Sequence, residues 1–262
     1  MPTAVVETLD LSLGYPGNIT LENANLRFER GEITCIVGGS GCGKSTLLKA
    51  MIGLLPPLEG SVRLLGEELY RLEENRRFGL LERVGVLFQN GALLNSMSVE
   101  ENVMIPMREH TSMPEIVMRR AARLKLRQVG LEHAAQLSPG QLSGGMRKRA
   151  ALARALALDP EVMFCDEPSA GLDPITGAGL DKLIIELSDV LDITVIVVTH
   201  ELHSIRTIAD KLIMLAPGRL VFSGSLDDAL ESSDQEIKAF FAREIQGEAE
   251  GRSLYSELTE EI

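Results

Sequence analysis

The sequence has no long apolar stretch, few cysteines and a shortage of positive charge. No run of about 18 apolar residues occurs among its 262 residues, so we expect no transmembrane helix. The opening stretch MPTAVVETLD has neither the basic nor the apolar region of a signal peptide, which predicts an unsecreted protein. The 38 acidic residues outnumber the 26 basic ones and give a net charge of −12. This acidity disfavours non-specific nucleic-acid binding, and we expect no nucleic-acid partner.

The cysteines do not form a metal-binding or disulfide pattern. Cys35, Cys42 and Cys165 are not at the spacing of metal ligands. An odd number of cysteines in an unsecreted chain predicts reduced thiols in the cytosol. Apolar residues make up 45% of the chain, which is enough to fill a sizeable core. The length fits one large domain or two small ones, and no internal repeat is present.

Three short apolar runs predict the strands of a parallel sheet. They are ITCIVGG at 33–39, EVMFCDEP at 161–168 and ITVIVVTH at 193–200. Continuous apolar strands separated by helices are typical of an α/β fold whose parallel sheet is covered on both faces. Ligands bind such sheets beyond the carboxyl ends of the strands. The glycines, carboxylates and histidine that end these runs therefore share one predicted site.

The remaining regions predict different structure. Residues 1–32 and about 58–70 have short alternating strands and turns, which predicts an antiparallel layer beside the parallel sheet. Residues of about 91–157 have mostly helical patterns and predict an inserted helical subdomain. We expect one domain over 1–246, followed by an acidic, polar tail over 247–262. The apolar residues of SLYSEL in this tail predict either a docking segment or a solubilising end.

A glycine-rich loop follows the first apolar run and opens a helix. The stretch GGSGCGKS fits the pattern G-x-x-x-x-G-K-S/T at every position. Glycines let backbone N–H groups wrap phosphates, and the helix N-terminus adds a favourable dipole. We expect Lys44 to reach the β- and γ-phosphates of a nucleotide, Ser45 to ligate Mg²⁺ and Thr46 to bind the α-phosphate. The predicted phosphate-binding residues, which would otherwise form only a glycine-rich surface turn, are Gly38, Gly39, Ser40, Gly41, Cys42, Gly43, Lys44, Ser45 and Thr46.

Polar side chains end the other two apolar runs. Asp166 can hold Mg²⁺ through water, and Glu167 can orient and deprotonate an attacking water. Two acids after a strand also occur as a solvated strand end or a helix cap, but the phosphate loop upstream favours the catalytic interpretation. His200 ends the third run, where it can sense a γ-phosphate or serve as an ordinary structural histidine. We expect Glu167, His200 and Lys44 to be catalytic and Asp166 to bind the metal.

A second glycine-containing stretch, QLSGGMRKRAALARAL, opens another predicted helix with a hydroxyl and two glycines. By itself it can equally form an ordinary helix N-cap. Together with the phosphate loop and DEP, however, LSGG makes about residues 5–240 resemble the ATP-binding cassette (ABC) ATPases. The resemblance implies ATP and Mg²⁺ as cofactors and ATP hydrolysis as the activity. It also implies an α/β fold with a mostly parallel core sheet, an antiparallel β subdomain and an inserted helical subdomain.

The same resemblance assigns roles to three further residues. Tyr15 in GYPGN resembles the aromatic residue that stacks on adenine, although a turn tyrosine would look the same. Gln89 in VLFQN resembles the glutamine that joins the catalytic core to the helical subdomain and takes part in metal binding and catalysis. Asp173 in SAGLDP resembles the loop that contacts the partner subunit.

The resemblance also implies a homodimer. Each ATP would lie between the Lys44 loop of one chain and the loop of Ser143, Gly144 and Gly145 of the other. Met146 and Lys148, which follow this loop, occupy places where many members of the family have glutamine, so the helix contacts there need not follow the family pattern.

Several stretches resemble a narrower group within the family. They are LFQNGALLNSMSVEENVMIPMREHT, LSGGM and DEPSAGLDPIT, and they resemble the ATPases of Mla-type, Mce-linked systems that move phospholipids between bacterial membranes. This implies integral membrane permease subunits, a small regulatory subunit and an Mce-type substrate-handling protein as partners. It also implies a peripheral location at the cytoplasmic face of the inner membrane.

Other functions of the same superfamily were weighed against the sequence. A DNA-repair or chromosome ATPase needs long coiled-coil arms, and the helical region has no sustained heptads. A translation factor with two cassettes would have two phosphate loops, whereas this chain has one. A signalling ATPase that moves a membrane partner without transporting a substrate would use the same motifs and stays as the alternative.

Two smaller features have competing interpretations. Cys42 lies beside Lys44 and backbone N–H groups, which favours a reactive thiolate, but it can equally be an inert filler of a variable loop position. One predicted helix is strongly basic, and its charges either form a solvated face or contact anionic lipid headgroups or the permease. The basic residues of this helix are Arg119, Arg120, Arg123, Lys125 and Arg127.

Overall fold

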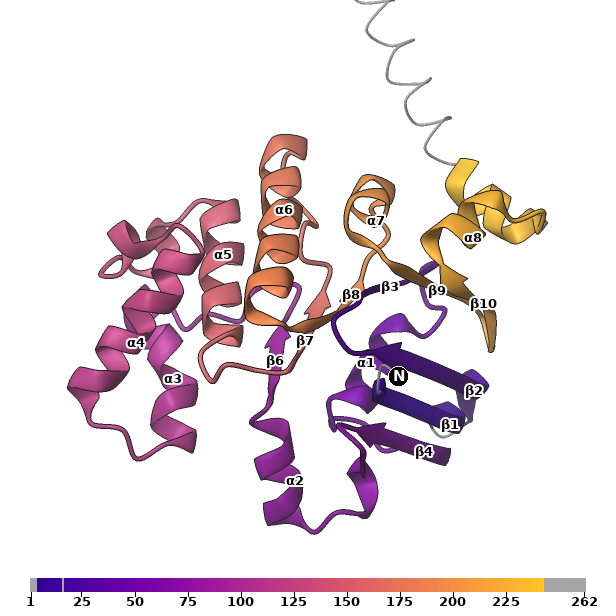
Figure 1. The fold of residues 1–262 in the computed structure, drawn as a ribbon, viewed down its shortest axis with the longest axis horizontal. Helices are drawn as coiled ribbons and strands as arrows, with labels where there is room; N and C mark the ends of the chain where they lie inside the picture. Colours follow the sequence, from indigo (N-terminus) through magenta and orange to yellow (C-terminus); the bar gives the residue numbers. More distant parts are fainter. Residues whose placement is uncertain (1–3, 16, 243–262) are drawn as a thin grey trace, which may run out of the picture.

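A computed structural model, which describes residues 4–15 and 17–242, contains two β-sheets flanked by helices (Figure 1). The larger sheet has the strand order β10-β9-β3-β8-β7-β6. Its strands β3, β6, β7, β8 and β9 run parallel, and β10 pairs antiparallel with β9. The bounds are β3 (Ile33–Gly38), β6 (Val84–Leu87), β7 (Val162–Asp166), β8 (Thr194–Val198), β9 (Lys211–Ala216) and β10 (Arg219–Ser225). The predicted α/β fold with a mostly parallel core sheet is confirmed.

The central strands of this sheet are buried on both faces. Every residue of β3 and β8 is buried. Successive side chains of a strand point to opposite faces, so Cys35 and Val37 join one cluster of core side chains and Ile36 joins another. Helices cover the first face, and a second sheet with α1 (Lys44–Met51) covers the other. The continuous apolar pattern of these strands follows from this double coverage.

The smaller sheet is antiparallel and has the strand order β2-β1-β4-β5. Its strands are β1 (Ala4–Tyr15), β2 (Asn18–Glu29), β4 (Glu59–Leu64) and β5 (Glu67–Glu68). Phe28 of this sheet and Phe164 of the parallel sheet lie in the same core cluster, which α1 and α2 (Glu74–Leu81) complete. The predicted antiparallel layer is therefore present, and it packs on one face of the parallel sheet.

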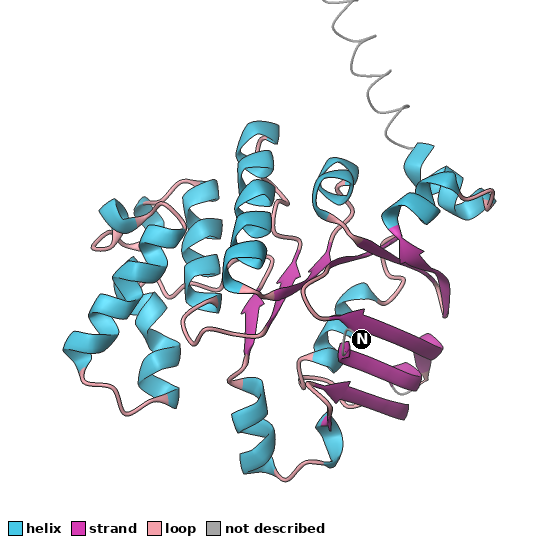
Figure 2. Cartoon of the chain, in the orientation of Figure 1, coloured by secondary structure: helices cyan, strands magenta, loops and turns pink. Residues whose placement is uncertain are grey.

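Helices fill the chain between β6 and β7, as predicted (Figure 2). They are α3 (Val99–His110), α4 (Glu115–Gln128) and α5 (Gly144–Ala155), and α6 (Pro174–Leu191), α7 (Leu202–Ile208) and α8 (Leu226–Glu231) follow later. Ser98 begins α3 with a capping box, in which it exchanges hydrogen bonds with Glu101. None of the helices in the described ranges combines the length and apolarity that crossing a bilayer requires. The predicted boundary at residue 246 and the predicted tail lie outside the described residues.

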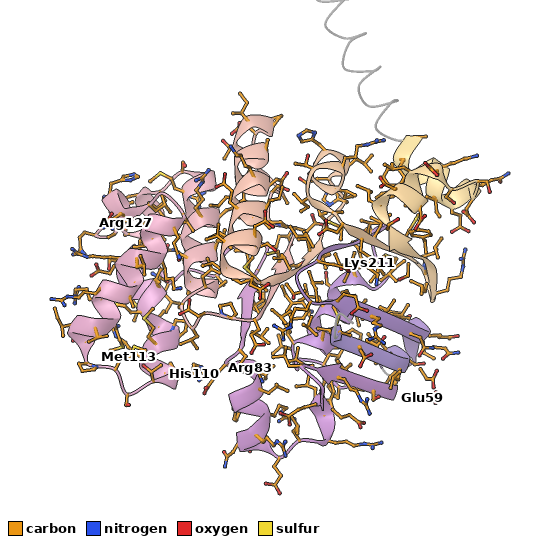
Figure 3. All side chains as sticks on the ribbon, viewed as in Figure 1. Glu59, Arg83, His110, Met113, Arg127 and Lys211 are labelled. Atoms are coloured by element: carbon orange, nitrogen blue, oxygen red, sulfur yellow. The ribbon has the colours of Figure 1, made fainter. Side chains whose placement is uncertain are left out.

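The basic side chains of α4 are mostly paired within the chain. Arg119 and Arg123 donate to the two carboxylate oxygens of Glu100 on α3, at 2.5 and 2.6 Å. Glu100 is fully buried, so these pairs tie α4 to α3. Figure 3 shows Arg127 on the outer side of the helical region, away from the sheets. Two further pairs are Arg127–Glu132 and Lys125–Asp159. The pairing favours an internally neutralised face over a surface for anionic lipid headgroups.

The Glu100 cluster yields a stability prediction. Burial by itself raises the pKa of Glu100, but the hydrogen bonds from Arg123 and Arg119 outweigh it and hold the pKa below its usual value. A carboxyl group with a lowered folded-state pKa stabilises the fold above its unfolded pKa, and this contribution is lost as the pH falls through the folded pKa. We predict that Glu100→Gln lowers the free energy of unfolding at neutral pH by about 2 kcal/mol, measured by urea unfolding.

The difference between wild type and Glu100→Gln should shrink below about pH 4, where the carboxyl groups become protonated. The matched control is Glu115→Gln. Glu115 also contacts Arg119, at 2.8 Å, but from an exposed position, so its loss should change stability little. Equal losses in the two variants would contradict the prediction, because they would show that burial of Glu100 has no effect.

Candidate functional site

The loop between β3 and α1 is shaped for glycine. Gly38 and Gly43 have φ angles of +148° and +104°. A Cβ on Gly38 would lie 2.3 Å from the carbonyl oxygen of Leu215 in β9. A Cβ on Gly43 would lie 3.1 Å from the carbonyl oxygen of Thr20 in β2. The loop therefore needs a bare backbone to fit between the two sheets, in addition to the access that glycine gives to a ligand.

Lys44, the first residue of α1, bends back over this loop. Its Nζ donates to the carbonyl oxygens of Gly38 and Gly39, each at 2.9 Å. Ser45 is exposed and Thr46 is half-buried on the same first turn. An ammonium and a helix N-terminus that share one loop provide positive potential for phosphate oxygens.

Cys42 lies inside the protein rather than at the mouth of the loop. It has no exposed surface and belongs to the core cluster around α1. A Cβ on Gly38 would lie only 2.7 Å from its sulfur atom. An alkylating reagent has no access to a thiol in this place. The hypothesis of a reactive thiol is therefore wrong, and the interpretation as an inert filler holds.

Glu167 and His200 meet where β7 and β8 end. Oε1 of Glu167 lies 2.8 Å from Nδ1 of His200. The other carboxylate oxygen, Oε2, is buried and lacks a hydrogen-bond partner within the described part of the chain. Glu167 has a φ of +48°, a left-handed conformation that costs a residue with a side chain of order 1 kcal/mol. Its N–H holds this conformation by donating to the carbonyl oxygen of Val198 at 2.8 Å.

Asp166, the last residue of β7, is half-buried beside these groups. Burial raises its pKa, the charge of Glu167 raises it further, and three lysines act in the opposite direction. A cation that is bound next to both carboxylates would remove this repulsion. The three lysines are Lys49, Lys148 and Lys44.

The predicted metal ligands fit magnesium chemically. Ser45, Gln89 and Asp166 offer hydroxyl, amide and carboxylate oxygens, which are the ligands that Mg²⁺ prefers. Within the described residues, no group of three or more His, Cys, Asp or Glu side chains could hold a metal. Mg²⁺ is commonly bound by one or two carboxylates together with substrate phosphates.

The phosphate loop, Lys44, Glu167 and His200 line one cavity of about 520 Å³. Leu202 at the start of α7 and Phe240 from the helical residues 235–242 complete its wall. The structure thus brings the loop and the ends of two strands together, as the sequence predicted. No sequence pattern pointed to Phe240, because only the return of the C-terminal part of the chain places it here.

The loop of Ser143, Gly144 and Gly145 lies elsewhere. Ser143 caps α5 by accepting a backbone N–H of its first turn at 3.3 Å. Gly144 lines a separate cavity of about 200 Å³ together with Gln89. A Cβ on Gly145 would lie 2.4 Å from a threonine methyl group of α6. Within one chain, this loop does not line the cavity of Lys44.

Gln89 and Tyr15 also lie outside the walls of that cavity. Gln89 follows β6, and its carbonyl oxygen accepts a hydrogen bond from Lys148 at 2.6 Å. Tyr15 ends β1, and half of its side chain is exposed. The hairpin that follows it reaches the phosphate loop where Thr20 meets Gly43. Contact of Gln89 with a metal and of Tyr15 with adenine remain predictions.

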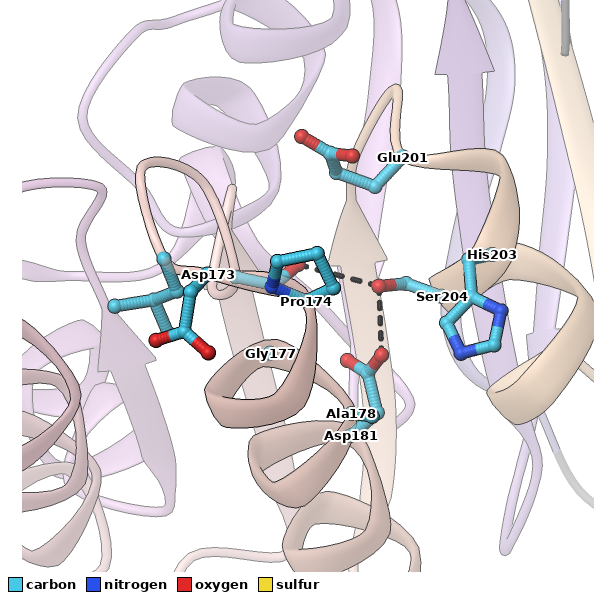
Figure 4. A pocket seen from close by; sticks show the side chains of 10 residues that line it. Asp173, Pro174, Gly177, Ala178, Asp181, Glu201, His203 and Ser204 are labelled. Carbon is cyan, nitrogen blue, oxygen red and sulfur yellow. Dashed lines mark hydrogen bonds between the residues drawn. The ribbon is translucent and has the colours of Figure 1, made fainter. Parts of the chain in front are cut away.

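Asp173 begins α6 as its N-cap. Its Oδ1 accepts the N–H of Thr176 at 3.0 Å, and the hydrogen bonds from Thr176 lower the pKa of Asp173. Figure 4 shows it at the rim of a pocket with Pro174 and Glu201. A helix cap leaves the loop before α6 in a fixed conformation, which suits a residue that presents a surface to a partner.

A buried chain of hydrogen bonds lies in the same pocket. Ser169 and Ser204 share a hydrogen bond at 3.2 Å, and Ser204 donates to Oδ2 of Asp181 at 2.7 Å (Figure 4). Burial raises the pKa of Asp181. Ser169 lies two residues after Glu167, and Ser204 lies four residues after His200. These hydrogen bonds therefore fix the ends of β7 and β8 relative to each other. No sequence pattern predicts this contact, because its members come from the turn after β7 and from two helices.

Comparison with known proteins now identifies the family. Residues 21–170 match the family described as ABC transporter. The chain is 39% identical to the intermembrane phospholipid transport system ATP-binding protein MlaF of Haemophilus influenzae, over 94% of this chain and 92% of that protein. It is also 39% identical to the probable ribonucleotide transport ATP-binding protein mkl of Mycobacterium leprae, over 92% of this chain and 70% of that protein.

A solved structure agrees with this assignment. The ATP-binding cassette MJ0796, in a dimeric post-hydrolysis state bound to ADP and Pi, superimposes with a TM-score of 0.77. The match covers 84% of this chain and 98% of that chain at 31% sequence identity. The family indicates ATP hydrolysis as the activity, and the chain belongs to the ABC transporter family.

Proposed function

We propose that this protein is the ATP-hydrolysing, nucleotide-binding subunit of a membrane transporter that moves phospholipids between bacterial membranes. The observation that carries the catalytic part is the single cavity in which Lys44, Glu167 and His200 meet. The likeness to MlaF over nearly the whole chain supports the cargo. The name of mkl assigns another cargo to that relative, and the longer MlaF match favours phospholipid.

The geometry suits hydrolysis by an attacking water. Glu167 lines the cavity beside the phosphate loop, where its carboxylate can accept a proton from a bound water, and His200 engages its Oε1. Lys44 and the loop N–H groups hold the phosphates that the water attacks. Ser45, Asp166 and Gln89 would hold Mg²⁺, which neutralises the charge of the phosphates when it is bound. His200 keeps the carboxylate oriented and supplies a donor near the γ-phosphate.

A complete site requires two chains. The Lys44 loop and the Ser143 loop line different cavities of one chain, so a nucleotide on Lys44 meets Ser143 only in a second copy. Each chain has one copy of each loop, and a two-fold homodimer satisfies both sites at once. Asp173 lies on the loop that would face the partner. The dimeric state of MJ0796 supports this arrangement.

A membrane partner has a suitable surface on the helical region. Leu94, Met113, Ile116 and Val117 expose between 44% and 59% of their surface there. Figure 3 shows Met113 and His110 at the end of the α3–α4 hairpin. Met113, Ile116 and Val117 are close in sequence, at the turn from α3 to α4, and such exposed apolar side chains favour a protein partner, which here is an integral membrane permease. The proposal also includes an Mce-type protein and a small regulatory subunit as partners and a location at the cytoplasmic face of the inner membrane, and the likeness to MlaF supports it.

The role of Glu167 is tested by removing its charge. We predict that Glu167→Gln binds ATP, loses turnover by a factor on the order of 10² to 10⁴ and accumulates as a closed dimer. Phosphate release and size-exclusion chromatography with ATP measure these effects. The control is Glu201→Gln, because Glu201 lies 3.8 Å from His200 on the exposed side; it should turn over normally. Near-normal turnover of Glu167→Gln would remove this residue from its role.

The shared site is tested by mixing two inactive chains. Lys44→Ala and Ser143→Arg should each abolish hydrolysis, because each variant spoils both sites of its own dimer. Half of the dimers in an equal mixture carry both variants, and each of these has one intact site, so we expect about a quarter of the wild-type rate. Cross-linking confirms that mixed dimers form. No recovery in such dimers would mean that both loops act within one chain.

The cargo is tested on the complex rather than on this subunit. We predict that the protein purified from its native membranes carries a permease and phospholipid, which mass spectrometry of bound proteins and lipids identifies. Lipid extracted from the same membranes without the complex is the control for carry-over. A permease bound to a cell-wall enzyme and free of enriched lipid would instead favour the signalling function.

A further inference from the structure

Lys148 is a buried cation between the segment of Gln89 and the turn of Glu167, and the functions proposed above do not use it. It lies on α5, and only 8% of its surface is exposed. Its Nζ donates to the carbonyl oxygen of Gln89 at 2.6 Å and to that of Glu167 at 2.9 Å. One ammonium therefore joins α5 to the segment after β6 and to the turn that carries the catalytic carboxylate.

The surroundings explain how a charge is tolerated there. Burial lowers the pKa of Lys148, and the negative charges of Glu167 and Asp166 oppose this effect. A buried ammonium is costly unless hydrogen bonds or opposite charges compensate it, and this site supplies both. A glutamine in this place would carry no charge and would have a shorter reach.

The turn of Glu167 depends on this contact. Glu167 has a φ of +48°, a left-handed backbone conformation that residues with a side chain rarely adopt, so neighbouring groups must hold it in place. Its N–H donates to the carbonyl oxygen of Val198, and its own carbonyl oxygen accepts from Lys148 at 2.9 Å and more weakly from the N–H of Ala170 at 3.4 Å. Both backbone hydrogen-bonding groups of the residue are thus engaged, one from the parallel sheet and one from the helical region.

A second cation on α5 holds the same segment without contacting Glu167. Arg154 donates to the carbonyl oxygens of Ala92 and Gly91, at 2.6 and 2.8 Å. Residues 89–92 form neither helix nor strand, so their position depends on α5. Lys148 differs from Arg154 because it connects this segment to the catalytic turn. The two residues therefore make a matched pair for an experiment.

We propose that Lys148 is a positioning residue that sets the place of the Glu167 carboxylate according to the place of α5 and of residues 89–92. A shift of α5 relative to the parallel sheet moves the ammonium and with it the backbone of Glu167. Leu94, one of the exposed apolar residues of the helical region, lies two residues after this segment. In the complex, contact with a membrane partner would therefore reach the catalytic base through Lys148, a consequence that rests on the proposed function.

The first experiment compares full-length variants without any partner. Lys148→Met keeps the length of the side chain and removes the donors, and we expect kcat to fall about tenfold to a hundredfold because the carboxylate is misplaced. KM and the affinity for a fluorescent ATP analogue should stay within about twofold, since the phosphate loop is untouched. Lys148→Arg should restore most of kcat, because it keeps both charge and donors. Arg154→Met should keep kcat within about threefold.

A structural readout separates positioning from general loosening. Amide hydrogen exchange of residues 89–92 should become faster in both Lys148→Met and Arg154→Met. Exchange of the Glu167 amide should become faster only in Lys148→Met. If Lys148→Met does not fold, which thermal unfolding reveals, Lys148→Gln takes its place and should give an intermediate loss of kcat, because its amide can reach one of the two carbonyl groups.

The proposal is overturned by either of two results. One is that folded Lys148→Met has the kcat of the wild type. The other is that Lys148→Met loses both kcat and ATP affinity and that Lys148→Arg restores neither. The second experiment measures how far the membrane partner changes the ATPase rate. That change should shrink in Lys148→Met and persist in Arg154→Met. If the first experiment succeeds and no partner alters the wild-type rate, the proposed transport function fails and the role of Lys148 in hydrolysis stands.

Discussion

The parallel pairing of β3, β8 and β7 is the constraint on which the rest of the site depends. In the observed register, Ile36 pairs with Val198, and Val198 pairs with Asp166. The three strands therefore end in one row, and the loops that leave them begin at the same edge of the sheet. This row is buried on both faces, so a slip in register would expose apolar side chains to water and is strongly disfavoured. The distances between the phosphate loop, Glu167 and His200 are therefore set by the packing of the strands rather than by contacts among these groups.

The loops beyond that edge have little regular structure, and cationic side chains hold their backbone carbonyl groups. Lys44 does so for Gly38, and Lys148 does so for Glu167 and for the segment after β6. Arg154 holds the next residues of that segment. Buried backbone carbonyl groups need partners, and a hydrogen bond from a charged donor is stronger than one from a neutral donor. A phosphate that binds Lys44 or a movement of α5 can therefore rearrange these loops while the sheet keeps its shape.

The Lys44 cavity and the Ser143 loop lie apart within one chain, and this separation explains why the proposed transport cycle needs two chains. A single chain holds the proposed catalytic base and the phosphate loop in one cavity, but its second glycine-containing loop lines another. ATP would therefore act as part of the interface between two copies, and hydrolysis would remove that part. Helices α3, α4 and α5 join the interface to the surface where a permease would bind. The same helices hold the segment of Gln89, so opening of the dimer and movement of the partner would be coupled.

The amino-acid sequence by itself determined three strands of the larger sheet, the antiparallel layer, the phosphate loop, the carboxylates after one strand and the histidine after another, but it did not predict β6, β9 and β10. These features depend on local patterns: alternation or continuity of apolar residues, glycines at fixed spacing and polar residues at strand ends. Only the tertiary structure decided that Cys42 is buried, that Arg119 is neutralised by Glu100, and that Phe240 and Lys148 reach the site. The physical reason is that burial and ion pairing depend on which elements pack together, and contacts between elements far apart in the chain leave no local pattern.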